Sequence, residues 1–521
     1  MWVNAHSFHV LLGASYEQFL KDQMTGVANN LLSNDFFSFN FYDNSAAANS
    51  SLTDLIQPWK MASLFGRLNY DFNNRYLFEA NFRYDGSSRL DPSKRWDLFP
   101  SFSAGWRVNE ESWFEPLRDE VSNLKIRASW GQLGNSSALS GYFPYLGLIT
   151  NKDASGNVIS YVGNTVYYQQ EMASKDITWE VLQSTNIGID IGLLDSRLNM
   201  TADYWWKQNK NMMANMQVGH IIGVDVPAQN IGQLNTWGWE FSANWNDKIG
   251  PVTYQIGFNI EDSQNKLVKY TGANVISEGT VARLEGYALN TIWGYKTDGY
   301  WSSRQEYLDY KAAHPGYVSF QDNMVTGGDV KYLAQGTPDH QIGTGDATPE
   351  NPGDLVCLGT TNGRYLYGIN LAAQWKGFDF TVFFQGTGKR SFLINSRTIA
   401  PLAYSYEMPW TVHLDYWTED NQDAFFPRII NYNAADPFDY RPSDKWVQNG
   451  AYIRLKNIQL GYTIPVLKKN IQNLRIYIAG TDVWEQSQVL KVFDPEVGDN
   501  TQKSQYYPFF RTWTTGISVT F

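Results

Sequence analysis

Few residues of this 521-residue chain have the types and spacing that catalysis or metal binding requires. Its histidines lack the spacing of a metal-dependent protease; they are His6, His9, His220, His314, His340 and His413. No Gly-x-Ser-x-Gly motif presents a nucleophile on a sharp turn. The paired carboxylates Glu110–Glu111 and Asp119–Glu120 fall in a predicted turn, where solvation is their ordinary role. We therefore assign no catalytic residue and no metal ligand, and we expect neither an enzyme nor a cofactor.

Ligand binding is better supported, because aromatic residues make up 16% of the chain and sugar rings stack on aromatic faces. The candidates for a substrate-contacting lining are Trp205, Tyr300, Trp301, Tyr404 and Tyr406. Packing or a place in an interfacial belt is the competing interpretation of each ring, and the sequence favours it.

Composition restricts the possible partners and compartments. The net charge is −11, and Lys and Arg do not cluster, which argues against a nucleic acid partner. No apolar run reaches about eighteen residues, so we expect no membrane-spanning helix, and a closed β-barrel is the other architecture that satisfies its backbone in lipid. The single cysteine, Cys357, excludes a disulfide framework within the chain, and we expect it to be a small buried residue.

The C-terminal residues alternate between apolar and polar positions. Trp513, Ile517, Val519 and Phe521 fall on one face of a strand predicted over Arg511–Phe521, and polar residues fall on the other. A terminal aromatic residue on such a strand resembles the signal by which outer-membrane β-barrels are recognised for insertion. We therefore expect these four residues to act as an assembly signal and to face lipid.

The same alternation recurs along the chain and predicts roughly fourteen to sixteen strands of about ten residues each. We expect Trp237, Trp239, Phe241 and Trp245 to project outward as an aromatic belt at the membrane interface. The predicted strands before the terminal one are Phe8–Glu17, Leu64–Phe72, Tyr76–Tyr84, Phe99–Val108, Leu124–Trp130, Ile187–Leu193, Leu198–Trp206, Trp237–Trp245, Val252–Ile260, Tyr365–Trp375, Phe378–Gln385, Tyr452–Ile464 and Leu474–Thr481, with a weaker candidate at Ile292–Trp301.

Connections between these strands are of two kinds. Tight turns at 73–74, 195–196, 247–250 and 376–377 alternate with long segments at 134–177, 208–235, 388–449 and 485–510. Short turns on one side and long loops on the other are typical of an outer-membrane barrel. A soluble β-sandwich would not be expected to keep its loops so unequal or its apolar faces so aromatic.

Several motifs occur together, in order, from one end of the chain to the other. They are Arg67–Asp71, Arg83–Arg89, Trp96–Ser101, Ser103–Arg107, Leu124–Gly131, Thr178–Glu180, Asn186–Asp190, Gly294–Gly299, Trp446, Arg454–Asn457, Leu460–Tyr462 and Phe493–Val497. Each is weak alone, but in combination the chain resembles the SusC/RagA-like branch of TonB-dependent outer-membrane transporters of Bacteroidetes. That resemblance implies the import of oligosaccharides or peptides.

The resemblance also implies a transmembrane antiparallel barrel of 22 strands that holds a plug and works with a SusD-like surface lipoprotein. Signal peptide, TonB box and plug precede the barrel in such proteins, and we find none of them before Ala5. We expect residues 1–521 to form a single partial barrel domain, the C-terminal two thirds, without the plug and first strands. Coupling to TonB–ExbB–ExbD would need the region that is missing.

One departure from the family concerns a cation site. Relatives commonly carry an Asp-x-Asn-x-Asp-Gly run after the position of Tyr332, which resembles a calcium loop. Here Leu333–His340 lacks carboxylates at alternate positions. We therefore expect no bound cation in this loop.

Three functions remain open. The leading one is nutrient import through the outer membrane, with lipid, a SusD-like lipoprotein and an oligosaccharide or peptide as partners. The second is a surface adhesion or display barrel that transports nothing. The third is a soluble β-rich binding protein, which would be released from cells without detergent.

Overall fold

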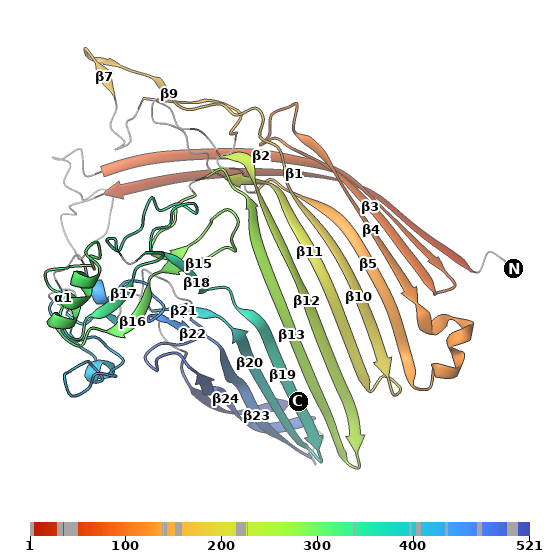
Figure 1. Cartoon of the computed structure of the whole chain (residues 1–521). Coiled ribbons are helices and arrows are strands. Elements are labelled where there is room, and N and C mark those ends of the chain that lie inside the picture. The colour runs from red at the N-terminus through yellow and green to blue at the C-terminus, as the bar shows by residue number, and fades with distance from the viewer. Residues whose placement is uncertain are drawn as a thin grey trace. The chain divides into compact units, whose positions relative to one another are not determined.

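The computed structural model describes residues 5–28, 35, 50–137, 139, 143–151, 159–214, 226, 228–272, 274–337, 339–394, 399–402, 408–432, 436–465, 471–497 and 509–521. Within them the dominant element is a 14-stranded antiparallel sheet (Figure 1). Its strands, in spatial order, are β1 (His6–Ala28), β2 (Ser50–Phe72), β3 (Tyr76–Ser87), β4 (Trp96–Arg107), β5 (Val121–Asn135), β10 (Glu180–Leu193), β11 (Leu198–Ala214), β12 (Gln229–Ile249), β13 (Val252–Lys269), β19 (Arg364–Trp375), β20 (Phe378–Lys389), β23 (Tyr452–Ile464), β24 (Asn473–Ser487) and β25 (Thr512–Thr520). Each predicted long strand has a counterpart here, which confirms the all-β fold class.

Residues that tolerate positive φ angles form the tight turns. Asn73 and Asn74 each have a φ of 55° between β2 and β3, as a type I′ hairpin requires. Between β19 and β20, Lys376 and Gly377 have φ angles of 43° and 90°. The hairpins predicted at these two places are confirmed.

Several strands are longer than the predicted ten or so residues. β1 and β2 contain 23 residues each and pair along their whole length, from His6 opposite Phe72 to Ala28 opposite Ser50. Beyond Glu17 exposed apolar side chains lie on both faces, so alternation ends there although the backbone pairing continues. The periodicity therefore locates these strands but underestimates their length.

The weaker candidate at Ile292–Trp301 does not join the large sheet, so its assignment as a barrel strand is wrong. β15 (Thr291–Gly294) pairs instead with β14 (Gly279–Val281) and β18 (Val356–Thr360), and β16 (Lys296–Tyr300) pairs with β17 (Val330–Leu333). All residues of β15 are buried, on both faces of the strand. That burial places the segment inside a folded core.

These short strands belong to a compact structure that we call the loop body, comprising the described residues of 274–361 and 390–449 (Figure 1). Its first segment connects β13 to β19, and its second connects β20 to β23. Both leave the strands at the ends opposite the Lys376 turn. Two clusters of buried hydrophobic residues fill it, one around Tyr295 and Tyr332 and the other around Phe426 and Trp446. Its other elements are α1 (Arg304–Ala313), β21 (Ser391–Leu393), β22 (Val447–Asn449) and the 3₁₀ helices η5 (Thr411–Leu414) and η6 (Phe438–Tyr440).

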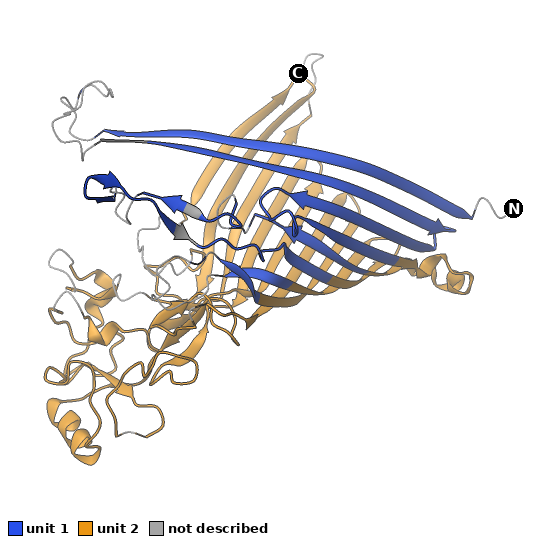
Figure 2. Cartoon of the chain, turned by 90° about the horizontal axis from the view of Figure 1, so that it is seen from above, with its two compact units in different colours: residues 1–104, 129–184, 209–232 blue, residues 105–128, 185–208, 233–521 orange. Residues whose placement is uncertain are grey.

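The chain divides into two compact units, which Figure 2 colours separately. The first unit comprises residues 1–104, 129–184 and 209–232, and the second comprises residues 105–128, 185–208 and 233–521. The first has its own hydrophobic cluster, formed by Leu90, Phe99, Leu139, Ile177 and Trp179. The second contains the loop body, and treating 1–521 as one barrel domain stays a prediction.

Short elements complete the fold between the long strands. They are η2 (Val108–Glu110), η3 (Ser112–Leu117), β6 (Leu148–Thr150), β7 (Ser160–Tyr161), β8 (Asn164–Thr165) and β9 (Tyr168–Glu171). Among the helices of the described residues, none has the length and apolar character needed to cross a membrane.

Candidate substrate-binding surfaces

Ion pairs between strands occupy one face of the sheet in the second unit. Arg127 of β5 donates to Asp203 of β11 at 2.6 Å and lies 3.2 Å from Asp190 of β10. A further pair on this face is Arg475 with Asp379 at 2.5 Å. The alternation pattern predicted that Arg127 and Asp203 lie on polar faces of their strands, and the fold brings them together across 76 positions of sequence.

Trp205 lies on this polar face. Its Nε1 donates to Glu240 Oε1 at 3.0 Å, and Lys207 Nζ lies 4.5 Å from the centroid of its ring. Gly238 leaves room for the indole, since a Cβ there would come within 2.7 Å of a Trp205 ring carbon. An aromatic ring laid over a glycine and flanked by an ammonium and a carboxylate has the groups needed to stack against and hydrogen-bond a sugar.

The other substrate candidates lie in the loop body or outside the described residues. Trp301 is 0% exposed and makes edge contacts with Tyr307 and Tyr310, so it packs a core that no ligand reaches in this structure. Tyr300 is half-buried and donates to the carbonyl oxygen of Phe425 at 2.7 Å. Tyr404 and Tyr406 fall outside the described residues. Among the three described candidates, Trp205 is the one on the polar face of the sheet.

The predicted belt residues lie on the face of β12 that is opposite Glu240. Ser242, on the same side as Glu240, shares a hydrogen bond of 2.6 Å with Thr201, so the odd-numbered positions point the other way. Trp239 is exposed, and Trp237, Phe241 and Trp245 are half-buried. This position agrees with an outward direction, and their role as a membrane belt stays a prediction.

The terminal strand β25 pairs with β24, from Thr520 opposite Asn473 to Thr512 opposite Thr481. The four predicted signal residues are all exposed, and they share one parity along the strand; they are Trp513, Ile517, Val519 and Phe521. The alternating strand predicted from the sequence is therefore present, while its role in assembly stays a prediction.

A family model described as TonB dependent receptor-like, beta-barrel, matches residues 2–328, which is more than half of the chain. The chain belongs to this family. Two of its relatives are TonB-dependent receptor P26 of Formosa agariphila, 27% identical over 99% of this chain, and TonB-dependent receptor SusC of Bacteroides thetaiotaomicron, 26% identical over 88% of it. The chain spans about half the length of these receptors, 51% of P26 and 44% of SusC.

Solved structures agree with this assignment at the level of the fold. The RagAB peptide transporter superposes with a TM-score of 0.75 at 19% identity, and the match covers 99% of this chain and 53% of the transporter chain. The same importer in its open-open state gives a TM-score of 0.76 at 20% identity. The resemblance inferred from the sequence motifs is thus confirmed. This TonB-dependent receptor chain is an outer-membrane protein whose large sheet belongs to a transmembrane antiparallel β-barrel.

Two of the sequence motifs shared with TonB-dependent receptors, Arg454–Asn457 and Phe493–Val497, meet in one ionic cluster. Arg454 is 2% exposed and donates to Glu485, to Asp494 at 2.6 Å and to Glu496 at 2.5 Å. Lys456 adds a contact of 3.1 Å to Glu496. Arg454–Asn457 lies on β23 and Phe493–Val497 lies in the loop after β24, so this cluster fixes that loop to the barrel wall.

The loop body contains a buried pair of carboxyl groups that the sequence analysis missed. Asp439 is 0% exposed and accepts hydrogen bonds from the Val330 amide at 2.7 Å and from the Tyr432 hydroxyl at 2.8 Å. Asp329 beside it is 1% exposed and pairs with Arg428 at 2.5 Å. Burial and the charge of Asp329 raise the pKa of Asp439 well above its ordinary value. The side chains of Asp439 and Asp329 share a hydrogen bond, a contact that no local sequence pattern signals.

Lys445 is enclosed by aromatic rings in the same body. Its Nζ lies 4.4 Å from the centroid of Tyr300, 5.3 Å from that of Phe425 and 5.5 Å from that of Trp446. Burial lowers the pKa of Lys445 to about 8. The cation–π contacts compensate part of this cost, so Lys445 joins the two hydrophobic clusters rather than facing open water.

The remaining chemical candidates have structural roles. His340 Nε2 lies 2.9 Å from Asp354 Oδ1, and the other Asp354 oxygen accepts from the Gly343 amide at 2.8 Å. Among the described residues no cluster of His, Cys, Asp and Glu could hold a metal ion. Glu111 accepts from Trp106 Nε1 at 3.0 Å. Cys357 is exposed on β18, so the expectation that it is buried is wrong, because it lies at the edge of a short sheet.

Proposed function

We propose that this chain supplies the barrel wall and outer loops of a TonB-dependent importer of oligosaccharides or peptides. The observation that carries the proposal is the two-sided sheet of a family barrel: ion pairs such as Arg127 with Asp203 occupy one face, while aromatic side chains such as Tyr204 and Trp206 are exposed on the other. A wall between lipid and an aqueous lumen needs these two faces. The polar face is then the lumenal one, and Trp205 is its candidate contact for a passing ligand.

Import of this kind makes and breaks no bond, so the chain is not an enzyme and needs no cofactor. Energy would come from TonB–ExbB–ExbD, acting through a plug and TonB box that lie N-terminal to the barrel in this family. A SusD-like surface lipoprotein is the proposed partner on the outer side. The loop body suits that role, because its core fixes the loops before any partner binds.

Uptake by living cells tests the proposal. Cells with and without the gene are supplied with fluorescent oligosaccharides or with fluorescent peptides, and uptake is compared with and without a protonophore. We expect the gene-dependent fraction for one ligand class to disappear with the protonophore, because TonB transmits the proton-motive force. Binding to cells that persists unchanged with the protonophore would contradict import.

That contrary result would support the alternative, a barrel for surface adhesion or display. The feature that favours this alternative is again the loop body, since a folded outer structure can bind a partner without transport. Loss of cell attachment on deletion of the gene, with no loss of uptake, would establish it.

A further inference from the structure

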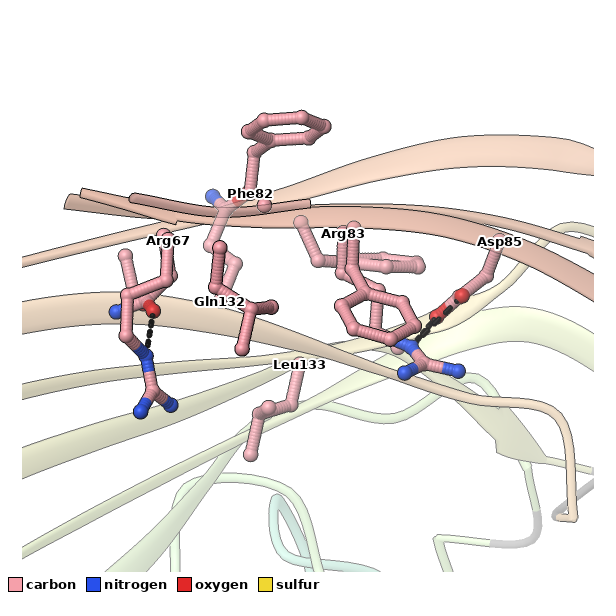
Figure 3. A pocket seen from close by; sticks show the side chains of 13 residues that line it. Arg67, Phe82, Arg83, Asp85, Gln132 and Leu133 are labelled. Atoms are coloured by element: carbon pink, nitrogen blue, oxygen red, sulfur yellow. Dashed lines mark hydrogen bonds and ion pairs between the residues drawn. The ribbon is translucent and has the colours of Figure 1, made fainter. Parts of the chain in front are cut away.

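A cavity of about 530 Å³ opens on one face of β1 to β5, entirely within the first unit. Figure 3 shows the side chains of Arg67 and Arg83 extending to the same side of the sheet, while Phe82 points to the other side. The lining contains these two arginines and one carboxylate, Asp85. The cavity thus has an excess of positive charge although the whole chain is acidic.

The two guanidinium groups are held in place by the wall, and each keeps free donors. Arg67 Nε donates to Asn81 Oδ1 at 2.8 Å, and neither of its Nη groups has a partner among the described residues. Arg83 donates from Nε to Asp85 and from Nη2 to Ser63, each at 2.8 Å. Its Nη1 has no hydrogen-bond partner among the residues that the structure describes. The Arg67 fork is therefore fixed at its base and open at its end.

An open guanidinium end presents two parallel N–H donors, which match the two oxygens of a carboxylate. Gln132 and Ser101 add polar groups to the same lining. Glu79 lies 3.9 Å from Arg67 Nε, and its Oε1 accepts a hydrogen bond from the side-chain amide of Asn81 at 2.8 Å.

The cavity also has an apolar side. The ring of Phe65 lies over Gly13, where a Cβ would come within 2.4 Å of it, and the Arg83 guanidinium lies 5.6 Å from the ring centroid. Leu11 extends this side from β1. A ligand that fits would therefore carry an apolar group next to its anionic one.

We propose that this cavity is a binding site for a carboxylate borne on an apolar segment of the transported ligand, with Arg67 as the principal anchor. The inference rests on the proposed import for the origin of that ligand. A peptide C-terminus and a sugar uronate share the required chemistry.

Calorimetry on the protein expressed from its own gene and purified in detergent tests the site, with 3-phenylpropionate and its uncharged amide as probes. We expect the acid to bind at least about tenfold more tightly than the amide, as a charge-assisted bidentate contact implies. Arg67→Gln should abolish this preference, and Arg67→Lys should restore part of it. Lys125→Gln is the matched control, because it removes a positive charge from β5 outside the cavity lining and should change nothing.

Equal binding of acid and amide by the wild-type protein would overturn the inference, as would an equal loss of preference in Arg67→Gln and Lys125→Gln. Peptides with free and amidated C-termini, and disaccharides with and without a uronate, then identify the source of the carboxylate. Failure of the acid–amide test beside energy-dependent uptake would refute the site and leave import intact. A preference for the acid without energy-dependent uptake would support the site and refute import.

Discussion

Trp205 is the residue at which a ligand in the proposed lumen would meet an aromatic surface. If the ligand is an oligosaccharide, as proposed, Trp205→Ala should weaken its binding about fivefold, because ring contacts of this kind contribute about 1 kcal/mol. Trp205→Phe keeps a ring but loses the hydrogen bond to Glu240, so a smaller loss is expected. Titration of each purified variant with the oligosaccharide measures the effect.

Trp206→Ala is the control for Trp205, since the neighbouring side chain lies on the opposite face of β11. It should leave affinity unchanged. Equal affinity of Trp205→Ala and the wild-type protein would remove Trp205 from the substrate path.

Asp439 makes the loop body sensitive to pH. Because its folded-state pKa lies above the unfolded value, its stabilising effect is complete at low pH and is lost as pH rises through the folded-state pKa. We therefore expect the protease resistance of the loop body to fall as the pH rises from the ordinary pKa of an aspartate toward the raised pKa of Asp439. Asp439→Asn, which has an amide that can still donate to Asp329, should keep resistance nearly constant over this range.

Asp439→Ala is the complementary variant, because it removes the carboxyl group altogether. It leaves the Val330 amide and the Tyr432 hydroxyl without their acceptor, at a cost of about 3 kcal/mol, so digestion should be rapid at every pH. A pH profile that is the same in Asp439→Asn and in the wild-type protein would show that another group titrates.

At the scale of elements, the cluster around Arg454 holds the loop after β24 against β23. Arg454→Met would leave Glu485, Asp494 and Glu496 without their principal cation, which costs about 3–5 kcal/mol for a buried pair. We expect protease cleavage within 488–497 to become fast while β23 and β24 stay protected. Lys456→Met should have a smaller effect, because Arg454 still binds the same loop. Slow cleavage in Arg454→Met would mean that the loop is held by its apolar contacts.

Local periodicity was sufficient to predict the elements of the wall but not those of the loops. β3 and β11 alternate cleanly, because each residue there faces one of two different solvents. The outer parts of β1 and β2 escaped prediction, since apolar residues such as Phe19 and Leu20 lie on both faces where neither face is sealed. The loop body escaped entirely, because contacts such as Tyr295 with Phe320 and Asp439 with Val330 join residues that follow no common period.

For the candidate site too, residues on the strands of the wall could be predicted and residues in the loops could not. Trp205 was predicted because it lies on an alternating strand whose face can be deduced. Trp301 was misplaced as a ligand contact, since its burial depends on Tyr307 and Tyr310 across a folded helix and loop. The cavity at Arg67 needed the register of the strands, which a single sequence does not specify.

At the scale of the whole molecule, the sheet should tolerate charge on one face and reject it on the other. Phe241→Lys places an ammonium toward the proposed lipid side and, at the interfacial depth expected of the belt, should cost up to about 1 kcal/mol. Asn244→Lys, on the opposite face of the same strand, should cost little. Unfolding of both variants in urea, followed by tryptophan fluorescence in lipid vesicles, compares them. Equal destabilisation would contradict the outward direction of the belt.

The placement of the hydrophobic clusters also determines how heat would unfold this protein. Almost all of their residues lie in the loops, and Phe99 is an exception on a long strand. Heat capacity rises on unfolding in proportion to the apolar surface newly hydrated, and the outward rings of the strands are not sealed from their surroundings beforehand. The calorimetric heat-capacity step should therefore come mainly from the loop body, as an early transition that leaves most of the β-sheet signal in circular dichroism in place, because the long strands stay folded. In thermodynamic terms this outer-membrane chain carries a small globular protein on its wall.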